Sequence, residues 1–587
     1  MHDLVIRGGT VVDGSGGPGF VADVAIDGDI IVHVGTVDTP GRRTIDADGL
    51  LVTPGFVDIH THFDGQATWD PHLTPSCWHG VTTAILGNCG VGFAPVLPEG
   101  QQRLVEVMEG VEDIPGTALY EGIRWEWESF PEYLKALERT PRALDVGAQV
   151  PHAAVRTYVM GERALEDATG DDLAAMRSIV TRALEAGALG FSSGRTRGHR
   201  DVNGKPVPGT FAADKELEVI FGALAETGRG VFQVVPAGIG GIEGGDPEGS
   251  MGGELEWMIR LASSAPVPLT FLVMQSSFDP DGWRPWFEAV RVANASGAVL
   301  RPQVGSRCFG ALIGHQSRLN PFRYTDAYQR LAHLPLSERI VQLRHPEVRS
   351  AILAQAPSAN SRSTTLDRIT PGTFARLFPL GDPLDYEPTA ERSVAAVAAR
   401  TGRDPWEVTY DLMLGAQGRE FLLFPLLNYA GGSYDGVYDM ITDPCTVQGL
   451  GDGGAHSAIV CDASMTTYLL THWVRDRVRG PRIPLELAVR RLTKDGADLY
   501  GLKDRGLIET GRRADVNLID FERLSLSYPE RVTDLPAQAG RLIQRSEGYV
   551  ATMVAGEVVV DHGELTDARP GRLVRSGPGG RGSHSVP

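Results

Sequence analysis

The chain has 587 residues, of which 42% are hydrophobic and 22% are charged, as in ordinary globular proteins. Its net charge of −19 excludes the basic surface that nucleic-acid binding needs, and it argues against docking to anionic membranes. The five cysteines include no closely spaced pair, which excludes a disulfide framework. Because the sequence shows neither a leader-like amino terminus nor an apolar run of ~18 residues, we expect a cytoplasmic protein without a membrane span.

The two ends of the chain share one pattern. Residues 1–52 and residues 505–568 both contain short runs of valine and isoleucine separated by glycine and aspartate, which is typical of β-hairpins. We therefore predict one small β-sandwich domain that is built from both ends. Residues 569–587 are rich in glycine, proline, serine and arginine, and we predict that they are disordered.

Residues 53–504 alternate short apolar runs with longer helical patterns, which favours a distorted (β/α)8 barrel, also called a TIM barrel. Residues 305–445, before the last strand, are far too many for a βα loop, so we predict an inserted helical segment that covers the substrate site. The predicted barrel strands are residues 55–59, 82–86, 145–150, 188–192, 230–235, 269–275 and 298–303, and an eighth strand that ends near residues 450–452.

Two histidines follow the first predicted barrel strand. Because side chains at positions i and i+2 of a strand share one face, His60 and His62 can both point into the mouth of the barrel. The active sites of such barrels lie at the carboxyl ends of the strands. Such a pair is more often structural when it stands alone, but at this place it predicts a metal site.

Cys89, Asp452 and His456 lie at other predicted strand ends. Cys89 ends the second strand between Gly87 and Gly90, and a thiolate is a strong zinc ligand. Asp452 ends the eighth strand, where a carboxylate can contact the metal and take a proton from the attacking water. We expect His456 either to polarise the substrate carbonyl or to orient Asp452.

Five short segments carry a family pattern: PGFVDIHTH at 54–62, GVTT at 80–83, GNCG at 87–90, GALGFSSG at 187–194 and GRRADV at 511–516. Together they resemble the amidohydrolase superfamily, and within it the N-acyl-D-amino-acid deacylase (D-aminoacylase) branch. The resemblance implies a barrel with a composite β-domain, a zinc cofactor and Asp452 as the general base. It also implies that Cys89 replaces the carboxylated lysine that bridges two metals in many relatives.

The sequence departs from that family at two positions. D-aminoacylases place metal-binding histidines at the ends of strands five and six, where strand counting gives Gln233 and Gln275 here. Because an amide oxygen is a poor zinc ligand, we expect the second metal site to be weak or absent. We expect one Zn²⁺ per chain, with other divalent metals still open, and its predicted ligands are His60, His62, Cys89 and Asp452.

These residues predict a metal-dependent amidohydrolase that cleaves a C–N amide bond of an N-acyl amino acid or a related small molecule. Two alternatives stay open: a cyclic amide or imide hydrolase that uses the same site, and a catalytically silent amidohydrolase-like binding protein. We expect no nucleic-acid or membrane partner, and the sequence leaves a homo-oligomer open. Candidates for contact with the substrate are His152, Arg156, Arg195, Gln233 and Gln275.

Overall fold

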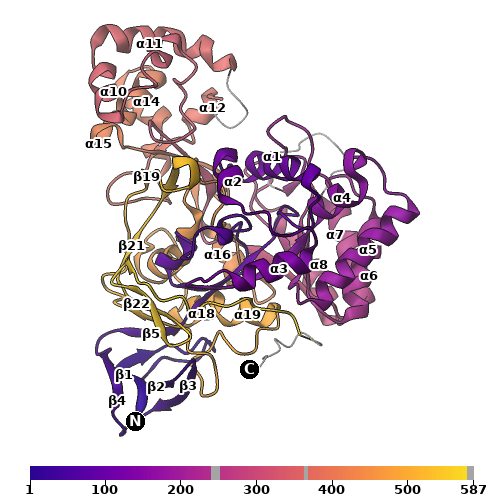
Figure 1. The fold of residues 1–587 in the computed structure, drawn as a ribbon. Helices are drawn as coiled ribbons and strands as arrows, with labels where there is room; N and C mark the ends of the chain where they lie inside the picture. The colour runs from indigo at the N-terminus through magenta and orange to yellow at the C-terminus, as the bar shows by residue number, and fades with distance from the viewer. Residues whose placement is uncertain (240–250, 363–367, 578–587) are drawn as a thin grey trace.

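The computed structural model describes residues 1–239, 251–362 and 368–577 (Figure 1). Eight parallel strands form a curled sheet in the order β16-β12-β11-β10-β9-β8-β7-β6. Each strand overlaps its predicted range or lies just before the predicted end, so the barrel prediction is confirmed. The strands are β6 (Phe56–Asp58), β7 (Val81–Leu86), β8 (Asp145–Pro151), β9 (Gly190–Gly194), β10 (Val231–Val235), β11 (Leu269–Leu272), β12 (Leu300–Val304) and β16 (Val447–Gln448).

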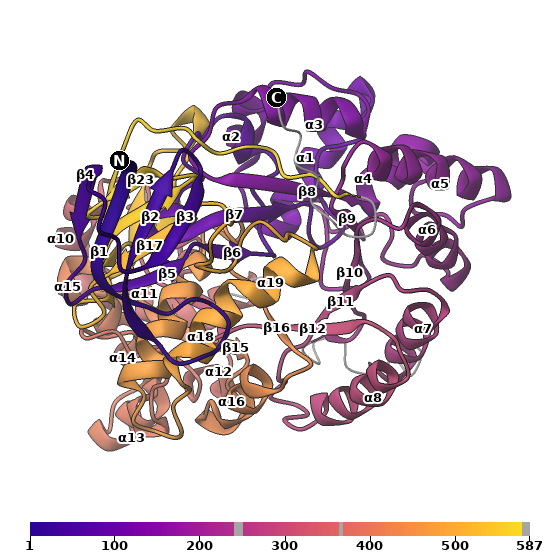
Figure 2. The same ribbon diagram turned by 90° about the horizontal axis from the view of Figure 1, so that it is seen from below.

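Helices of the βα connections surround these strands, as Figure 2 shows most clearly for α5 to α8. Within the described ranges, no helix is long and apolar enough to cross a membrane. The helices are α1 (Gln101–Glu112), α2 (Gly116–Gly122), α3 (Phe130–Arg139), α4 (His152–Met160), α5 (Gly170–Glu185), α6 (Asp214–Thr227), α7 (Met251–Ser264), α8 (Trp283–Ala295), α16 (Asp435–Thr442), α17 (Met465–Tyr468), the π-helix Leu469–Asp476, α18 (Leu485–Leu492) and α19 (Lys494–Leu499).

The local sequence sets where these helices begin. At the start of α3, the Ser129 hydroxyl accepts a hydrogen bond from the Glu132 backbone N–H, and the Glu132 carboxylate accepts one from the Ser129 backbone N–H. Thr169 and Asp172 form the same reciprocal pair at the start of α5. Such a capping box satisfies two N–H groups that would otherwise lack partners, so each helix begins at a defined residue.

The barrel closes just beyond the ends of its first and last strands. The backbone N–H of Asp452 donates to the carbonyl of His60 at 2.9 Å, and the N–H of His62 donates to the carbonyl of Gly453 at 2.8 Å. The Asp58 carboxylate accepts from the His60 N–H at 3.1 Å. A Cβ atom at Gly451 would lie 2.1 Å from Asp58 Oδ2, so only glycine fits there. Three of the predicted metal ligands, His60, His62 and Asp452, therefore also take part in the hydrogen bonds that close the barrel.

Both chain ends contribute to the additional β-rich domain. Its strands form one continuous sheet, which packs around a core that includes Ile6, Val24, Val516 and Met553. The sheet is made of β1 (His2–Val11), β2 (Phe20–Asp27), β3 (Ile30–Gly35), β4 (Gly41–Asp46), β5 (Leu51–Pro54), β17 (Val516–Ile519), β22 (Tyr549–Val554), β23 (Glu557–Asp561) and β24 (Glu564–Leu565). Two short ribbons pair β18 (Ser525–Leu526) with β21 (Ser546–Glu547) and β19 (Glu530–Val532) with β20 (Arg541–Ile543).

A buried ionic cluster joins this domain to the barrel. Asp145, at the start of β8, lies 2.7 Å from Arg505 and 3.0 Å from Arg513. Arg513 also lies 3.3 Å from Asp515, and all four side chains are nearly inaccessible to solvent. Arginine can hold two carboxylates in this way because its guanidinium presents several donors in a fixed plane. The GRRADV segment thus ties the carboxyl-terminal strands to the barrel.

The segment between β12 and β16 forms a lobe with its own hydrophobic core. In Figure 1 its helices lie at the top of the molecule, at the end opposite to β1 and β4. Besides helices it contains a three-stranded sheet, β13-β15-β14, which the sequence did not predict. Its elements are β13 (Phe309–Ile313), α9 (Asp326–Gln329), α10 (Leu336–Leu343), α11 (Pro346–Ala359), α12 (Pro371–Phe374), β14 (Phe378–Pro379), α13 (Val394–Thr401), α14 (Pro405–Met413), α15 (Gly415–Gly418) and β15 (Leu422–Leu427).

The predicted disordered tail begins too early. Residues 569–577 pack against the amino ends of the barrel strands, and residues 578–587 lie outside the described residues. The N–H of Arg572 donates to Asp145 Oδ1 at 2.7 Å, and the N–H of Val574 donates to the Val146 carbonyl at 2.7 Å. Val574 joins the hydrophobic cluster at the amino ends of the strands. The two apolar residues Leu573 and Val574 hold this segment against the barrel, although its overall composition is typical of a disordered tail.

Candidate active site

The predicted metal ligands converge at the carboxyl ends of the strands. His60 Nε2 lies 3.2 Å from Cys89 Sγ and 3.4 Å from Asp452 Oδ1. His62 Nε2 lies 3.8 Å from the same Asp452 oxygen. Tetrahedral zinc with bonds of ~2.0–2.3 Å keeps its ligand atoms roughly 3.3–3.8 Å apart. These three separations are close to those of a zinc site, and the donor atoms of His60, His62 and Cys89 all lie within 4.8 Å of one another.

The backbone around this cluster is held in an unusual conformation. Cys89, Asp452 and His456 have φ angles of 56°, 44° and 48°, in the left-handed region that non-glycine residues rarely adopt. Each such residue costs about 1–3 kcal/mol and typically occurs where function requires it. Gly87 has a φ of 77°, and a Cβ atom there would lie 2.2 Å from the Gln149 carbonyl oxygen. The GNCG segment thus turns sharply to bring Cys89 to the cluster.

Burial sets the protonation of these groups. It raises the pKa of the Cys89 thiol, with further contributions from the carboxylates of Glu112 and Asp452, and it raises the pKa of Asp452 well above its usual range. It lowers the pKa of His60 to about 4 and that of His62 well below its usual value. Without a bound cation, burial therefore favours the uncharged form of these four side chains. A divalent cation would reverse this balance, because it stabilises the thiolate, the carboxylate and the neutral imidazoles together. The donor set thus fits a metal ion.

A hydrogen bond orients His60. Its Nδ1 atom lies 2.9 Å from Gln303 Oε1, and an amide oxygen can only accept, so Nδ1 carries the proton. The lone pair of Nε2 then faces Cys89 and Asp452, as metal binding requires. The sequence analysis missed Gln303. It ends the seventh strand, so the strand counting that selected Gln233 and Gln275 could have found it.

Glu112 and His199 also belong to the site, and the sequence analysis missed both. Glu112 Oε1 lies 3.4 Å from His62 Nδ1, and its Oε2 lies 3.6 Å from His456 Nε2. His199, in the loop after β9, is close enough to contribute to the lowered pKa of His62. Neither residue ends a strand or belongs to a recognisable motif, so only the folded chain brings them here. His456, whose side chain is 30% exposed, faces the solvent side of the cluster.

Two candidate substrate residues belong to a separate buried network. His152 Nε2 lies 2.7 Å from Glu216 Oε1, and its Nδ1 lies 2.9 Å from the Ser193 hydroxyl. Arg156 donates to both oxygens of Glu216 at 2.6 and 2.7 Å. Both side chains are buried and already have partners within the chain, so the expectation that His152 and Arg156 contact a substrate stays a prediction. They hold α4 against α6.

The other three candidates also have internal partners. Arg195 forms a two-oxygen ion pair with Glu254 at 2.9 Å. Gln233 Oε1 accepts from the Cys89 backbone N–H at 3.1 Å, so Gln233 supports a metal ligand. Gln275 is used by the lobe, since its Oε1 accepts from the Ala430 N–H at 3.1 Å. Of these three, only Gln233 therefore touches the metal cluster.

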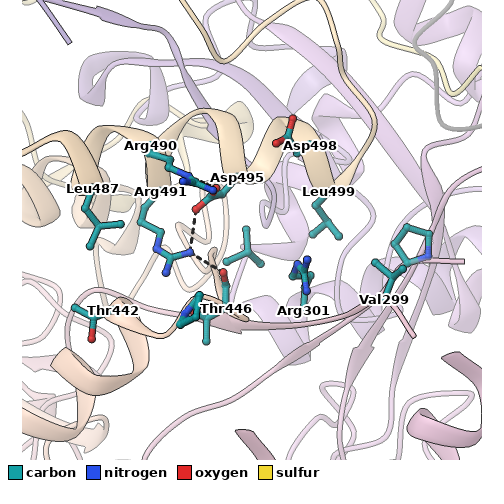
Figure 3. Close-up of a pocket in the computed structure, with 13 residues that line it drawn as sticks. Val299, Arg301, Thr442, Thr446, Leu487, Arg490, Arg491, Asp495, Asp498 and Leu499 are labelled. Carbon is teal, nitrogen blue, oxygen red and sulfur yellow. Dashed lines mark hydrogen bonds and ion pairs between the residues drawn. The ribbon is translucent and has the colours of Figure 1, made fainter. Parts of the chain in front are cut away.

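Two cavities lie at the end of the barrel opposite to these residues. Cavities of about 320 and 410 Å³ open at the amino ends of the strands, whereas the one that reaches Asp452 has about 20 Å³. Figure 3 shows the first, where Arg491 bonds to Asp495 and to the Thr446 carbonyl. Barrel enzymes carry out their chemistry at the opposite end. We therefore place the active site at the metal cluster.

Comparison with known proteins shows the family of the chain. The Amidohydrolase family model matches residues 43–560. N-acyl-D-aspartate deacylase of Alcaligenes xylosoxydans xylosoxydans is 27% identical over 583 residues, which cover 98% of this chain and 95% of the relative. The structure of N-acyl-D-glutamate deacylase from Bordetella bronchiseptica, solved with zinc and a phosphonate inhibitor, has a TM-score of 0.63 at 23% identity and covers 98% of this chain and 99% of its own. A D-aminoacylase structure gives the same TM-score and identity, with 98% and 100% covered. The chain belongs to the amidohydrolase family and is a metal-dependent hydrolase of C–N bonds other than peptide bonds.

Proposed function

We propose that the site binds one zinc ion and hydrolyses the amide bond of an N-acyl amino acid. The observation that carries the proposal is the convergence of the donor atoms of His60, His62 and Cys89, which all lie within 4.8 Å of one another, with Asp452 Oδ1 3.4 Å from His60 Nε2. Imidazole and thiolate donors favour zinc over the harder metals magnesium and calcium, which prefer oxygen. The atoms that would hold the ion are His60 Nε2, His62 Nε2, Cys89 Sγ and Asp452 Oδ1.

When bound, zinc supplies Lewis-acid polarisation of the scissile carbonyl and activation of a water molecule. Asp452 accepts the proton that this water loses as the new C–O bond forms. It then gives the proton to the nitrogen as the C–N bond breaks, so that a carboxylic acid and an amine leave. His456, on the solvent side of the cluster, is placed to hydrogen-bond to the substrate carbonyl. The backbone bond between Asp452 and His60 keeps the base fixed beside the metal ligands.

The positions of the two glutamines support a single metal ion. The Gln233 amide oxygen is committed to the Cys89 N–H, and the Gln275 amide bonds to the backbone of the lobe. An amide oxygen is a weak zinc ligand even when it is free to turn. The choice of an N-acyl amino acid rests on the relatives, whose names specify N-acyl-D-aspartate and N-acyl-D-glutamate.

The first experiment is the metal content of the protein purified without chelator or added metal. We expect about one zinc per chain, and we expect His60→Ala to lose it. The loaded protein is then tested on N-acyl-D-amino acids, N-acyl-L-amino acids and cyclic amides. Turnover of the first two classes supports the proposal, and turnover of cyclic amides alone contradicts the choice of substrate. A protein that takes up no metal would instead be a silent binding protein.

A further inference from the structure

Glu112 is a buried carboxyl group beside the metal ligands to which the proposed reaction gives no role. It is the last residue of α1, and it is 1% exposed. The helix ends there because Asp113 turns into the left-handed region, with a φ of 55°. The Glu112 carbonyl accepts a hydrogen bond from the backbone N–H of His456, which ties the helix end to the active-site loop. The position of the Glu112 side chain is therefore set by two separate parts of the fold.

Two polar atoms without other partners face each other at this place. His62 Nδ1 and Glu112 Oε1 are 3.4 Å apart, and neither has another hydrogen-bond partner in the described parts of the chain. Buried polar atoms in proteins are nearly always paired, and an unpaired one costs about 1–3 kcal/mol. Each atom is therefore the natural partner of the other. The opposite nitrogen of the ring, His62 Nε2, faces Asp452.

The second oxygen of the same carboxyl group faces another histidine. Glu112 Oε2 lies 3.6 Å from His456 Nε2. One side chain thus spans a predicted metal ligand and the histidine nearest to the solvent. Gln303 stands in the same relation to His60, because it contacts the ring nitrogen that faces away from the donor set. Both imidazoles of the pair therefore have a polar group behind them.

We propose that Glu112 is a positioning residue that accepts the Nδ1–H of His62 and so keeps the Nε2 lone pair directed at the metal. The inference rests on the proposed function in one respect, since it requires a metal ion at this cluster. A carboxylate behind a metal-binding histidine fixes the ring and raises its basicity, and its loss typically weakens metal binding about 10–100-fold. Glu112 acts through His62 and does not itself bind the metal.

The test measures the zinc affinity of the full chain by competition with a chromophoric chelator. Glu112→Met removes the acceptor, and we expect it to weaken zinc binding at least ~10-fold. Glu112→Gln keeps an acceptor oxygen, as Gln303 does behind His60, and should lose less than Glu112→Met. The matched control is Glu106→Gln on the same helix, whose exposed carboxylate contacts Gln102 and Asn203 and should not affect zinc.

A double-mutant cycle separates positioning from a general effect on folding. In a His62→Ala background, Glu112→Met should weaken zinc binding no further, because the residue acts through the ring that is missing. The inference is overturned if Glu112→Met binds zinc as tightly as the wild type, or if Glu112→Gln loses as much affinity as Glu112→Met. It is also overturned if the loss in the His62→Ala background is as large as in the wild type. A wild-type chain that takes up no zinc overturns the proposed function, and this inference with it.

Discussion

Two buried clusters of histidines and carboxylates among the described residues differ in how their polar atoms are paired. The first is the predicted metal cluster: His60, His62 and Cys89, with Asp452 beside both histidines and Glu112 behind His62. The second is the network of Glu216 with His152 and Arg156, between α4 and α6. Both are nearly inaccessible to solvent. In the second network the close contacts are hydrogen bonds, whereas the first leaves His62 Nδ1 and Glu112 Oε1 unpaired.

The pKa values of Glu216 and Glu112 differ because of this difference in pairing. Burial raises the pKa of both, but hydrogen bonds and charges from His152 and Arg156 lower that of Glu216 to about 2. Glu112 has no such cationic partner, so burial and the nearby Asp64 raise its pKa to about 8. A satisfied network stabilises the fold, whereas donor atoms that converge without a partner mark a place for a ligand. Residue type alone does not separate the two cases.

The largest expected effect is on turnover, and it comes from replacing Asp452, the proposed general base of the metal cluster. Asp452→Asn keeps the shape of the side chain, and asparagine tolerates the left-handed backbone that Asp452 adopts, with a φ of 44°. We expect the variant to fold and to lose about 10²–10⁴-fold in kcat, because it cannot accept the proton. Steady-state kinetics together with a thermal unfolding curve would check both parts. Activity close to that of the wild type would exclude Asp452 as the base.

The second largest effect is on stability, and it comes from replacing Glu216 in the hydrogen-bonded network between α4 and α6. Glu216→Gln leaves the buried Arg156 without its ion-pair partner, which costs about 3–5 kcal/mol of unfolding free energy. Denaturant unfolding measures the loss, and the zinc content of the folded protein should stay unchanged. Glu218→Gln on the same helix is the control, because its half-exposed carboxylate pairs only with the surface residues Arg260 and Lys215. Loss of zinc in Glu216→Gln would show that the two clusters are coupled.

The fold was predictable because several barrel strands are short runs rich in buried valine, leucine, isoleucine and phenylalanine. Strands buried on both faces need no alternation of polar residues, so runs such as β7 and β10 stand out from the helices around them. The tail was misjudged because composition averages over Leu573 and Val574, which do the packing. The sheet in the lobe was missed because β14 has two residues, Phe378–Pro379, and carries no pattern of its own.

The site was predictable only where a residue ends a strand. His60, His62, Cys89 and Asp452 follow strand ends, and the barrel brings all strand ends together. Glu112 reaches the same place from the end of a helix, and its position depends on how α1 packs. His152 also follows a strand end, but it begins α4 and its side chain bonds to Glu216. Sequence position thus gives proximity to the site, and only the fold shows which way a side chain turns.

The smallest expected effect concerns the pH dependence of stability, and it adds a buried histidine outside both clusters to the comparison. His79 is fully buried between the Thr467 hydroxyl at 2.9 Å and the Gln544 carbonyl at 2.8 Å, and burial lowers its pKa to about 4. In the unfolded chain the pKa of this histidine is about 6.5, so between pH 6.5 and 4 the unfolded chain binds a proton there that the folded chain does not bind. Stability therefore falls as the pH drops from about 6.5 towards 4, by roughly 1–3 kcal/mol for this group. We compare chelator-treated samples of the wild type and of His79→Gln. The variant should have a lower free energy of unfolding at neutral pH, but that free energy should fall less than the wild-type value on acidification. Parallel pH profiles would mean that His79 keeps the same proton affinity in the folded and unfolded chains.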